Sequence, residues 1–91
     1  MQEFKIKYPD WYDEFAEIEH EAKGYLEGVL VIFPRGELAL NFYDAARFTQ
    51  DAADEVCLDG FFYMSNVVIV ESVSKKHIEA AVQKIFDQMH I

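Results

Sequence analysis

Three polar side chains in the first quarter of the chain have the residue types and spacing of a transition-metal site. Glu17, His20 and Glu21 lie three and four residues apart, so a helix would place them at neighbouring surface positions. Carboxylates and imidazoles ligate transition metals, and the Glu-x-x-His motif occurs in di-iron helix bundles. A di-iron site also needs a second such helix and two further glutamates facing a bundle core. We therefore expect this run to be a solvated helix face, with no bound metal or other cofactor.

A cysteine and a histidine later in the chain supply the residue types of a thiol nucleophile and its base. Cys57 and His77 would have to meet in the fold, together with an acidic group that orients the histidine. Cys57 is flanked by Val56 and Leu58, however, and free cysteine is among the most buried residue types. The sequence therefore predicts that Cys57 is a small buried hydrophobe and not a catalytic thiol.

Motifs for common enzyme reactions are missing from the chain. The four glycines are isolated and form neither the Gly-x-Gly-x-x-Gly nor the Walker pattern that binds phosphate. There is no Gly-x-Ser-x-Gly elbow for acyl transfer. Arg47 has Asp44 and Asp51 at helical spacing, which predicts an exposed ion pair. These features favour a non-enzymatic role.

Hydrophobic periodicity divides the chain into strands and helices. Strands are indicated by a period of two or by runs of β-branched residues, and helices by apolar stripes with a period near 3.6. The Phe33-Pro34-Arg35-Gly36 segment predicts a tight hairpin. The predicted elements are a strand ending at Tyr8, a helix from Pro9 to Lys23, a strand from Tyr25 to Phe33, a strand from Glu37 to Tyr43, a helix from Asp44 to Gly60, a strand from Phe61 to Glu71 and a helix from Ser74.

Each predicted helix has one apolar stripe that we expect to pack on the sheet. The stripes are Trp11, Phe15, Ile18 and Ala22; Ala45, Phe48, Ala52 and Val56; and Ile78, Ala81, Val82, Ile85 and Met89. The order β-α-β-β-α-β plus one helix predicts an α+β fold in which residues 1–91 form a single domain. Its expected form is a ferredoxin-like two-layer sandwich with an additional C-terminal helix.

Right-handed crossovers would place the first and third strands of this sandwich in the middle of a four-stranded antiparallel sheet, with the first two helices on one face. The main alternative detaches the first strand. It leaves a three-stranded sheet with helices on both faces.

Composition and charge exclude several classes of partner. The chain is 52% hydrophobic, which suits a folded domain and not a disordered one. Its formal charge of -9 repels nucleic acids and anionic membranes, and no apolar run has the roughly 20 residues of a membrane span. The N-terminal residues do not resemble a secretion signal, and a lone Cys57 forms no internal disulfide. We expect a cytoplasmic protein.

Two strands have apolar residues on both faces, which predicts that a second surface covers the sheet. The third helix, a second copy of the chain or a small apolar ligand would each serve. Arg35, at the hairpin tip, is the better of the two arginines for contacting a partner. The predicted partner interface comprises Val29, Val31, Phe33, Arg35, Phe61, Tyr63, Val67 and Ile69.

Three functions remain open at this point. The favoured one is a non-enzymatic protein-binding or regulatory module that forms a dimer through its apolar sheet face. The second is an acidic inhibitor that occupies a basic nucleic-acid-binding groove of another protein. The third is a small dimeric ferredoxin-like enzyme with His20 or His77 as its acid-base group. The acids available to an inhibitor are Asp10, Asp13, Glu14, Glu17, Glu19, Glu21, Asp51, Asp54, Glu55 and Asp59.

Overall fold

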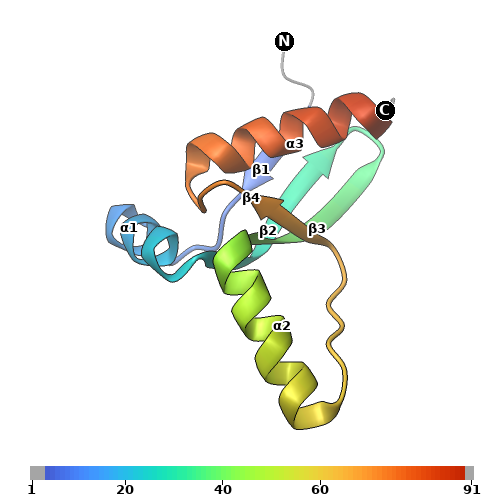
Figure 1. Cartoon of the computed structure of the whole chain (residues 1–91). Coiled ribbons are helices and arrows are strands. Elements are labelled where there is room, and N and C mark those ends of the chain that lie inside the picture. Colours follow the sequence, from blue (N-terminus) through green and yellow to red (C-terminus); the bar gives the residue numbers. More distant parts are fainter. Residues whose placement is uncertain (1–3, 90–91) are drawn as a thin grey trace.

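The computed structural model describes residues 4–89, and Figure 1 shows the elements that they form. Their order confirms the predicted sequence of strands and helices, and the α+β class with it. The elements are β1 (Lys5–Lys7), α1 (Glu14–Lys23), β2 (Tyr25–Phe33), β3 (Gly36–Asp44), α2 (Ala45–Asp59), β4 (Val67–Val70) and α3 (Lys75–Met89).

The strand order in the sheet is β1-β2-β3-β4, which differs from the predicted ferredoxin-like order. The first two pairs are antiparallel and β3–β4 is parallel, so β2 and β3 lie in the middle. Helix length gives a physical reason for this difference. The 10 residues of α1 span about 15 Å, whereas the 9 residues of β2 span about 30 Å. A helix this short does not carry the chain back along the sheet, and β2 pairs antiparallel with its neighbour β1.

Local hydrogen bonds set the ends of α1. Its N-cap is Asp13, whose carboxylate accepts a hydrogen bond from the amide of Ala16 at 2.8 Å. The predicted start at Pro9 is wrong because the amide of Tyr12 donates to the carbonyl of Pro9 at 3.0 Å and closes a separate turn there. Gly24 ends the helix in the left-handed conformation, with φ of 83°, as its position predicts.

Helix α3 covers one face of the sheet, and the core lies between them (Figure 1). Alternate residues of β2 and β3 point toward α3, which contributes Ile78 and Val82 at 0% exposure. Burying one such aliphatic side chain stabilises the fold by about 1.5–3 kcal/mol. Other core residues are Phe4, Tyr12, Leu26, Val29, Val31, Phe33, Leu40, Phe42, Val70 and Val73. The predicted stripe of α3 is confirmed for Ile78, Ala81, Val82 and Ile85, and the Met89 side chain lies outside the described part.

The opposite side of the sheet is not covered by α1 or α2, contrary to the prediction. Because α1 precedes β2 and α2 follows β3, both lie at the end of the sheet away from the hairpin (Figure 1). Cross-strand pairing assigns this side, which we call the open sheet face, to alternate residues of all four strands. Its exposed or half-buried residues are Lys5, Lys7, Leu30, Ile32, Glu37, Ala39, Asn41, Val67 and Ile69.

The last strand is shorter than predicted. Residues 61–66 lie outside β4, which has only 4 residues. Asn66 takes the left-handed conformation, with φ of 55°, and its carbonyl accepts a hydrogen bond from the amide of Asn41 at 2.9 Å. The Asn41 side chain also donates to the carbonyl of Ser65 at 3.3 Å. Pairing with β3 therefore begins only after this bend. Within residues 4–89 no helix has the length and apolar character to cross a membrane.

Candidate functional site

The acidic side chains of the predicted metal motif hold α1 against the start of α3. Glu17 accepts a hydrogen bond from the amide of Lys75 at 3.2 Å, and Glu21 accepts one from the hydroxyl of Ser72 at 3.4 Å. The predicted solvated face is therefore confirmed for the exposed Glu21, but Glu17 and His20 are half-buried and the run also contacts Ser72 and Lys75. No three His, Cys, Asp or Glu side chains within residues 4–89 are placed to hold a metal ion.

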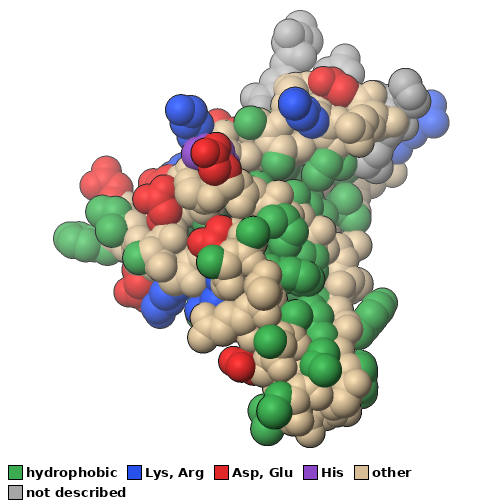
Figure 2. All heavy atoms as spheres, viewed as in Figure 1, with side chains coloured by type: hydrophobic (Ala, Val, Ile, Leu, Met, Phe, Trp, Pro, Cys, Tyr) green, Lys and Arg blue, Asp and Glu red, His purple; other side chains and the backbone are tan. Residues whose placement is uncertain are grey.

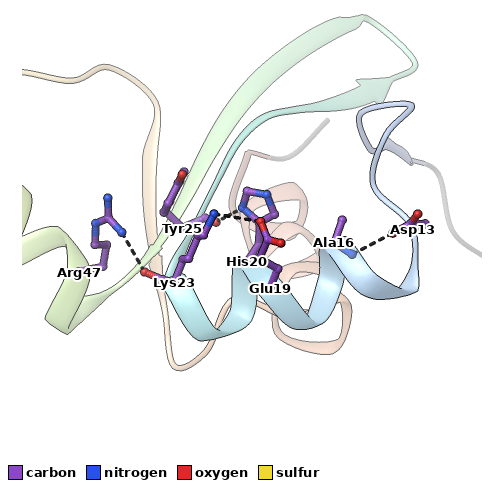
Figure 3. Close-up of polar contacts among 7 residues, drawn as sticks. All are labelled: Asp13, Ala16, Glu19, His20, Lys23, Tyr25 and Arg47. Atoms are coloured by element: carbon purple, nitrogen blue, oxygen red, sulfur yellow. Dashed lines mark hydrogen bonds and ion pairs between the residues drawn. The ribbon is translucent and has the colours of Figure 1, made fainter.

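The histidine of the same motif is a structural residue. Its Nδ1–H donates to the carbonyl of Tyr25 at 2.8 Å, a contact drawn in Figure 3. The His20 ring also packs at 5.0 Å from the ring of Trp11 and at 5.3 Å from that of Tyr25. His20 thus joins α1 to the start of β2, with its Nδ1–H committed to the carbonyl of Tyr25.

The apolar stripe of α1 points to solvent, which contradicts the expectation that it packs on the sheet. Trp11 is 55% exposed, Phe15 84% and Ile18 69%, and no residue of α1 is buried. The reason is the polar motif described above. Because Glu17 and Glu21 bind the start of α3, the stripe on the other side of the helix is turned outward.

His77 lies in a cluster with the residue types of a Ser-His-Glu triad. Its Nδ1 is 3.1 Å from the hydroxyl of Ser72 and 3.0 Å from that of Ser74, and its Nε2 is 3.3 Å from Glu71 Oε2. Both hydroxyls meet the same nitrogen, and the Glu71 side chain is 87% exposed, so water competes for the carboxylate. Ser74 immediately precedes α3, and its carbonyl accepts a hydrogen bond from the amide of Ile78 at 2.9 Å, so its side chain is held at the helix start beside His77. The cluster therefore stabilises the start of α3.

Helix α2 and residues 60–66 project from the end of the sheet as an arm (Figure 1). No residue of α2 is buried, and Cys57 is exposed, so the prediction of a buried cysteine is wrong. The arm is joined to the sheet through Phe48, whose ring meets that of Tyr43 in β3 edge-on at 5.8 Å. Within the arm, the Phe48 ring also meets that of Phe62 edge-on at 5.4 Å. These two contacts fix the first turns of α2 and leave the rest of the helix in solvent.

A pocket of about 400 Å³ separates α2 from the chain that returns to β4. Acidic side chains of the helix form one wall and aromatic side chains form the other. A hydrogen bond to Asp59 and the negative charge of that side chain raise the pKa of Glu55. The lining residues are Tyr43, Asp51, Asp54, Glu55, Asp59, Phe61, Phe62, Tyr63 and Met64.

The apolar side of α2 faces away from this pocket and lines a shallow hollow on the surface. Figure 2 shows hydrophobic side chains gathered over the arm and others projecting at α1. Val56 is 51% exposed, although it continues the stripe that begins at Phe48. We call this set the α2 stripe. Its residues are Phe48, Thr49, Ala52, Ala53, Val56 and Cys57.

Arg47 forms the ion pair that its spacing predicts and also joins two helices. Its Nε donates to Asp51 at 2.8 Å. One terminal nitrogen donates to the carbonyl of Lys23 at 3.2 Å, a contact drawn in Figure 3. The guanidinium lies 4.5 Å from the centre of the Tyr25 ring. Arg47 therefore connects the end of α1 to the start of α2.

The predicted partner interface divides into a buried and an exposed part. Val29, Val31 and Phe33 lie beneath α3 and offer no surface to a partner, which corrects that part of the prediction. These residues are buried because side chains alternate along a strand and all three point to the face on which α3 packs. Other residues of the predicted interface are exposed or half-buried, namely Arg35, Phe61, Tyr63, Val67 and Ile69.

Sequence reasoning missed that two apolar helix stripes are exposed. A stripe has the same local pattern whether it packs on its own sheet or on another molecule, so no sequence signal separates these cases. The candidate functional site comprises three exposed areas with apolar side chains, namely the α1 stripe, the α2 stripe and the open sheet face. Neither a protein-family model nor a curated protein nor a solved structure matches this chain.

Proposed function

We propose that this protein is a non-enzymatic interaction module that forms a dimer through its exposed apolar surface. One observation carries this proposal: α1 and α2 both have apolar stripes, and neither helix buries a single residue. Large exposed apolar patches are rare on monomers and mark interaction sites. The side-chain clusters around His20 and His77 have structural roles, which supports a binding function over catalysis.

The dimensions of the chain support association. The protein exposes 6239 Å², whereas a monomer of its mass typically exposes about 5,500 Å². The excess of about 700 Å² is close to the roughly 800 Å² that each partner buries in a standard protein interface. The radius of gyration is 13.9 Å, against about 12 Å for a compact chain of this length.

A second copy is the partner that the chain itself supplies. The same molecule presents an exposed helix stripe and an open sheet face, and a two-fold symmetric pair covers both at once. A single cysteine that is exposed and unbonded suits a reducing compartment, and we place this function in the cytoplasm.

Light scattering over a range of protein concentrations tests the proposal. We expect a mass of twice 10.6 kDa at high concentration, with dissociation on dilution. Val56→Glu should weaken the dimer at least about tenfold, because a charge would be buried in the contact. Leu58→Glu is the matched control, since Leu58 is 79% exposed on the other side of the same helix. A monomer at every concentration, or equal effects of the two variants, would contradict the proposal.

A further inference from the structure

We propose that the α2 stripe of one copy packs across the open sheet face of a second copy, and that the second copy returns the same contact. This inference rests on the proposed self-association and names the two surfaces that meet. It differs from a sheet-to-sheet or an edge-to-edge dimer, because each protomer contributes a helix to its partner's sheet.

The connection between β3 and β4 supplies the first argument. These strands are parallel neighbours, and α2 is the helix that links them. In such a unit the helix normally packs on the face of its own sheet. Here α2 extends away from the sheet (Figure 1). The α2 stripe therefore does not pack on its own sheet, and the open sheet face has no helix packed across it. Exchange between two copies restores both contacts at little cost.

The dimensions of the two surfaces match. The 15 residues of α2 span about 22 Å, within the roughly 30 Å length of β2. Four strands measure about 14 Å between the outer two, and a helix with its side chains is about 10–12 Å wide. One helix therefore covers most of the open sheet face. Ala39 lies opposite Leu30 near the middle of that face, and its small side chain leaves room for a helix.

Charge complementarity fixes how the helix would lie. Lys5 and Lys7 belong to the open sheet face along β1, and neither forms an ion pair with another residue in 4–89. Along one flank of the α2 stripe lie Glu55, three residues after Ala52, and Asp59. A second copy placed with this flank over β1 would bring two cations to two carboxylates. A hydrogen bond to Asp59 and the negative charge of that side chain raise the pKa of Glu55 in the single chain, and two cations beside these carboxylates would favour their charged forms.

Disulfide trapping between two different variants tests the contact directly. One copy carries Ala39→Cys together with Cys57→Ser, and the other is the wild-type chain with its single Cys57. After mixing and mild oxidation, a disulfide between position 39 and Cys57 can only join two chains. We expect this disulfide to be the dominant cross-link in non-reducing gels and in peptide mass spectrometry.

The matched control places the new thiol on α3. Ala80→Cys with Cys57→Ser introduces an exposed thiol on α3, the side of the sheet opposite the open sheet face. The proposed exchange does not bring the partner's α2 to this side. We expect no enrichment of a disulfide between position 80 and Cys57. Equal trapping at positions 39 and 80 would overturn the inference, because it would reflect random collision.

Two further outcomes separate this inference from the proposed function. A dimer by light scattering whose dominant disulfide joins Cys57 to Cys57 would retain self-association and overturn helix exchange. A monomer by light scattering would overturn both. In the single variant Ala39→Cys, which keeps Cys57, a disulfide within one chain would show that α2 packs on its own sheet, which also overturns the exchange.

Charge reversal provides a second readout. Lys5→Glu with Lys7→Glu should weaken the dimer at least about tenfold, since the two new glutamates would face the carboxylates of Glu55 and Asp59, which carry the same charge. Mixing this variant with Glu55→Lys/Asp59→Lys should recover a mixed dimer. Failure of the mixed pair to associate, while each variant remains folded by circular dichroism, would contradict the proposed orientation.

Discussion

Tyr8 and Tyr12 stack with their ring centres 5.1 Å apart between the N-terminal segment and α3. Both hydroxyls are buried and have no hydrogen-bond partner among the described residues. A buried hydroxyl without a partner loses its bonds to water and gains none in return. Lys75 compensates in part, because its ammonium lies 5.5 Å and 5.7 Å from the centres of the two rings.

Removing one of these hydroxyls should stabilise the protein. Tyr12→Phe keeps the 8%-exposed ring and deletes the oxygen without a partner, so we expect a gain of about 1 kcal/mol in the free energy of unfolding. Urea denaturation measures this change. Tyr63→Phe, at an 80%-exposed position, is the control and should have almost no effect. A loss of stability in Tyr12→Phe would mean that its hydroxyl is bonded after all.

The same burial predicts how stability depends on alkaline pH. Desolvation, with added repulsion from Glu17 and Glu21, raises the pKa of Tyr12 from 10.0 to about 12. The folded state therefore holds this proton more tightly than the unfolded state, and stability falls as the pH rises from 10.0 to about 12. Thermal unfolding across this range should show the fall, and Tyr12→Phe should reduce it. An identical fall in the variant would assign the effect to other groups.

At the scale of elements, a single junction sets the directions of α1 and α2. The amide of Asp44, which caps α2, donates to the carbonyl of Gly24, which ends α1, at 2.9 Å. The carboxylate of Asp44 in turn accepts a hydrogen bond from the amide of Arg47 at 2.8 Å. The end of one helix and the start of the next are thus built around one glycine.

Substitution of that glycine should be costly. A Cβ at Gly24 would lie 2.5 Å from a carboxylate oxygen of Asp44, in a backbone conformation with φ of 83°. We expect Gly24→Ala to lower the free energy of unfolding by about 2 kcal/mol or more. Gly36→Ala is the comparison, since a Cβ there meets nothing within 4 Å, and it should change stability little. Equal effects in urea denaturation would show that the Gly24 junction tolerates a side chain.

The stability contributions of two isoleucines should differ, because one lies on a helix packed against the sheet and the other on a helix exposed to solvent. Ile78 on α3 is fully buried, whereas Ile18 on α1 is 69% exposed. We expect Ile78→Ala to cost about 3 kcal/mol through lost burial and a cavity, and Ile18→Ala to cost under about 0.5 kcal/mol. Chemical denaturation at low protein concentration, where the monomer dominates, makes the comparison. Similar losses at both positions would mean that α1 is packed in the monomer.

At the scale of the whole molecule, the core is one-sided. The sheet packs on α3, while its other face and two helix stripes are exposed to solvent. The molecule is correspondingly elongated, with extents of 44 × 30 × 21 Å. Such a chain gains stability from any partner that binds only the folded state. Association and folding are then thermodynamically linked.

This linkage gives a prediction that needs no engineered thiol. The midpoint of thermal unfolding should rise with protein concentration, because dissociation accompanies unfolding of a dimer. In Val56→Glu the midpoint should be lower and should depend less on concentration, since the contact is weakened. A hundredfold dilution lowers the apparent stability of a dimer by roughly 2.7 kcal/mol. If the unfolding midpoint of the wild-type chain stays constant over such a dilution, the result would argue against a dimer.

The amino-acid sequence by itself determined what depends on near neighbours. The order of elements, the 33–36 hairpin and the caps at Asp44 and Gly24 follow from backbone conformations and hydrogen bonds that span a few residues. The buried stripe of α3 was also predictable, because its period matches the helix.

Only the tertiary structure decided the strand order, the length of β4 and the directions in which the α1 and α2 stripes point. These depend on contacts between residues far apart in the chain, such as Glu17 with Lys75 and Asn41 with Asn66. Periodicity states that a helix has an apolar side, but the surface against which that side packs is chosen by the summed energy of distant contacts. For that reason the sequence predicted the helices of this protein and not the exposed surface that they form.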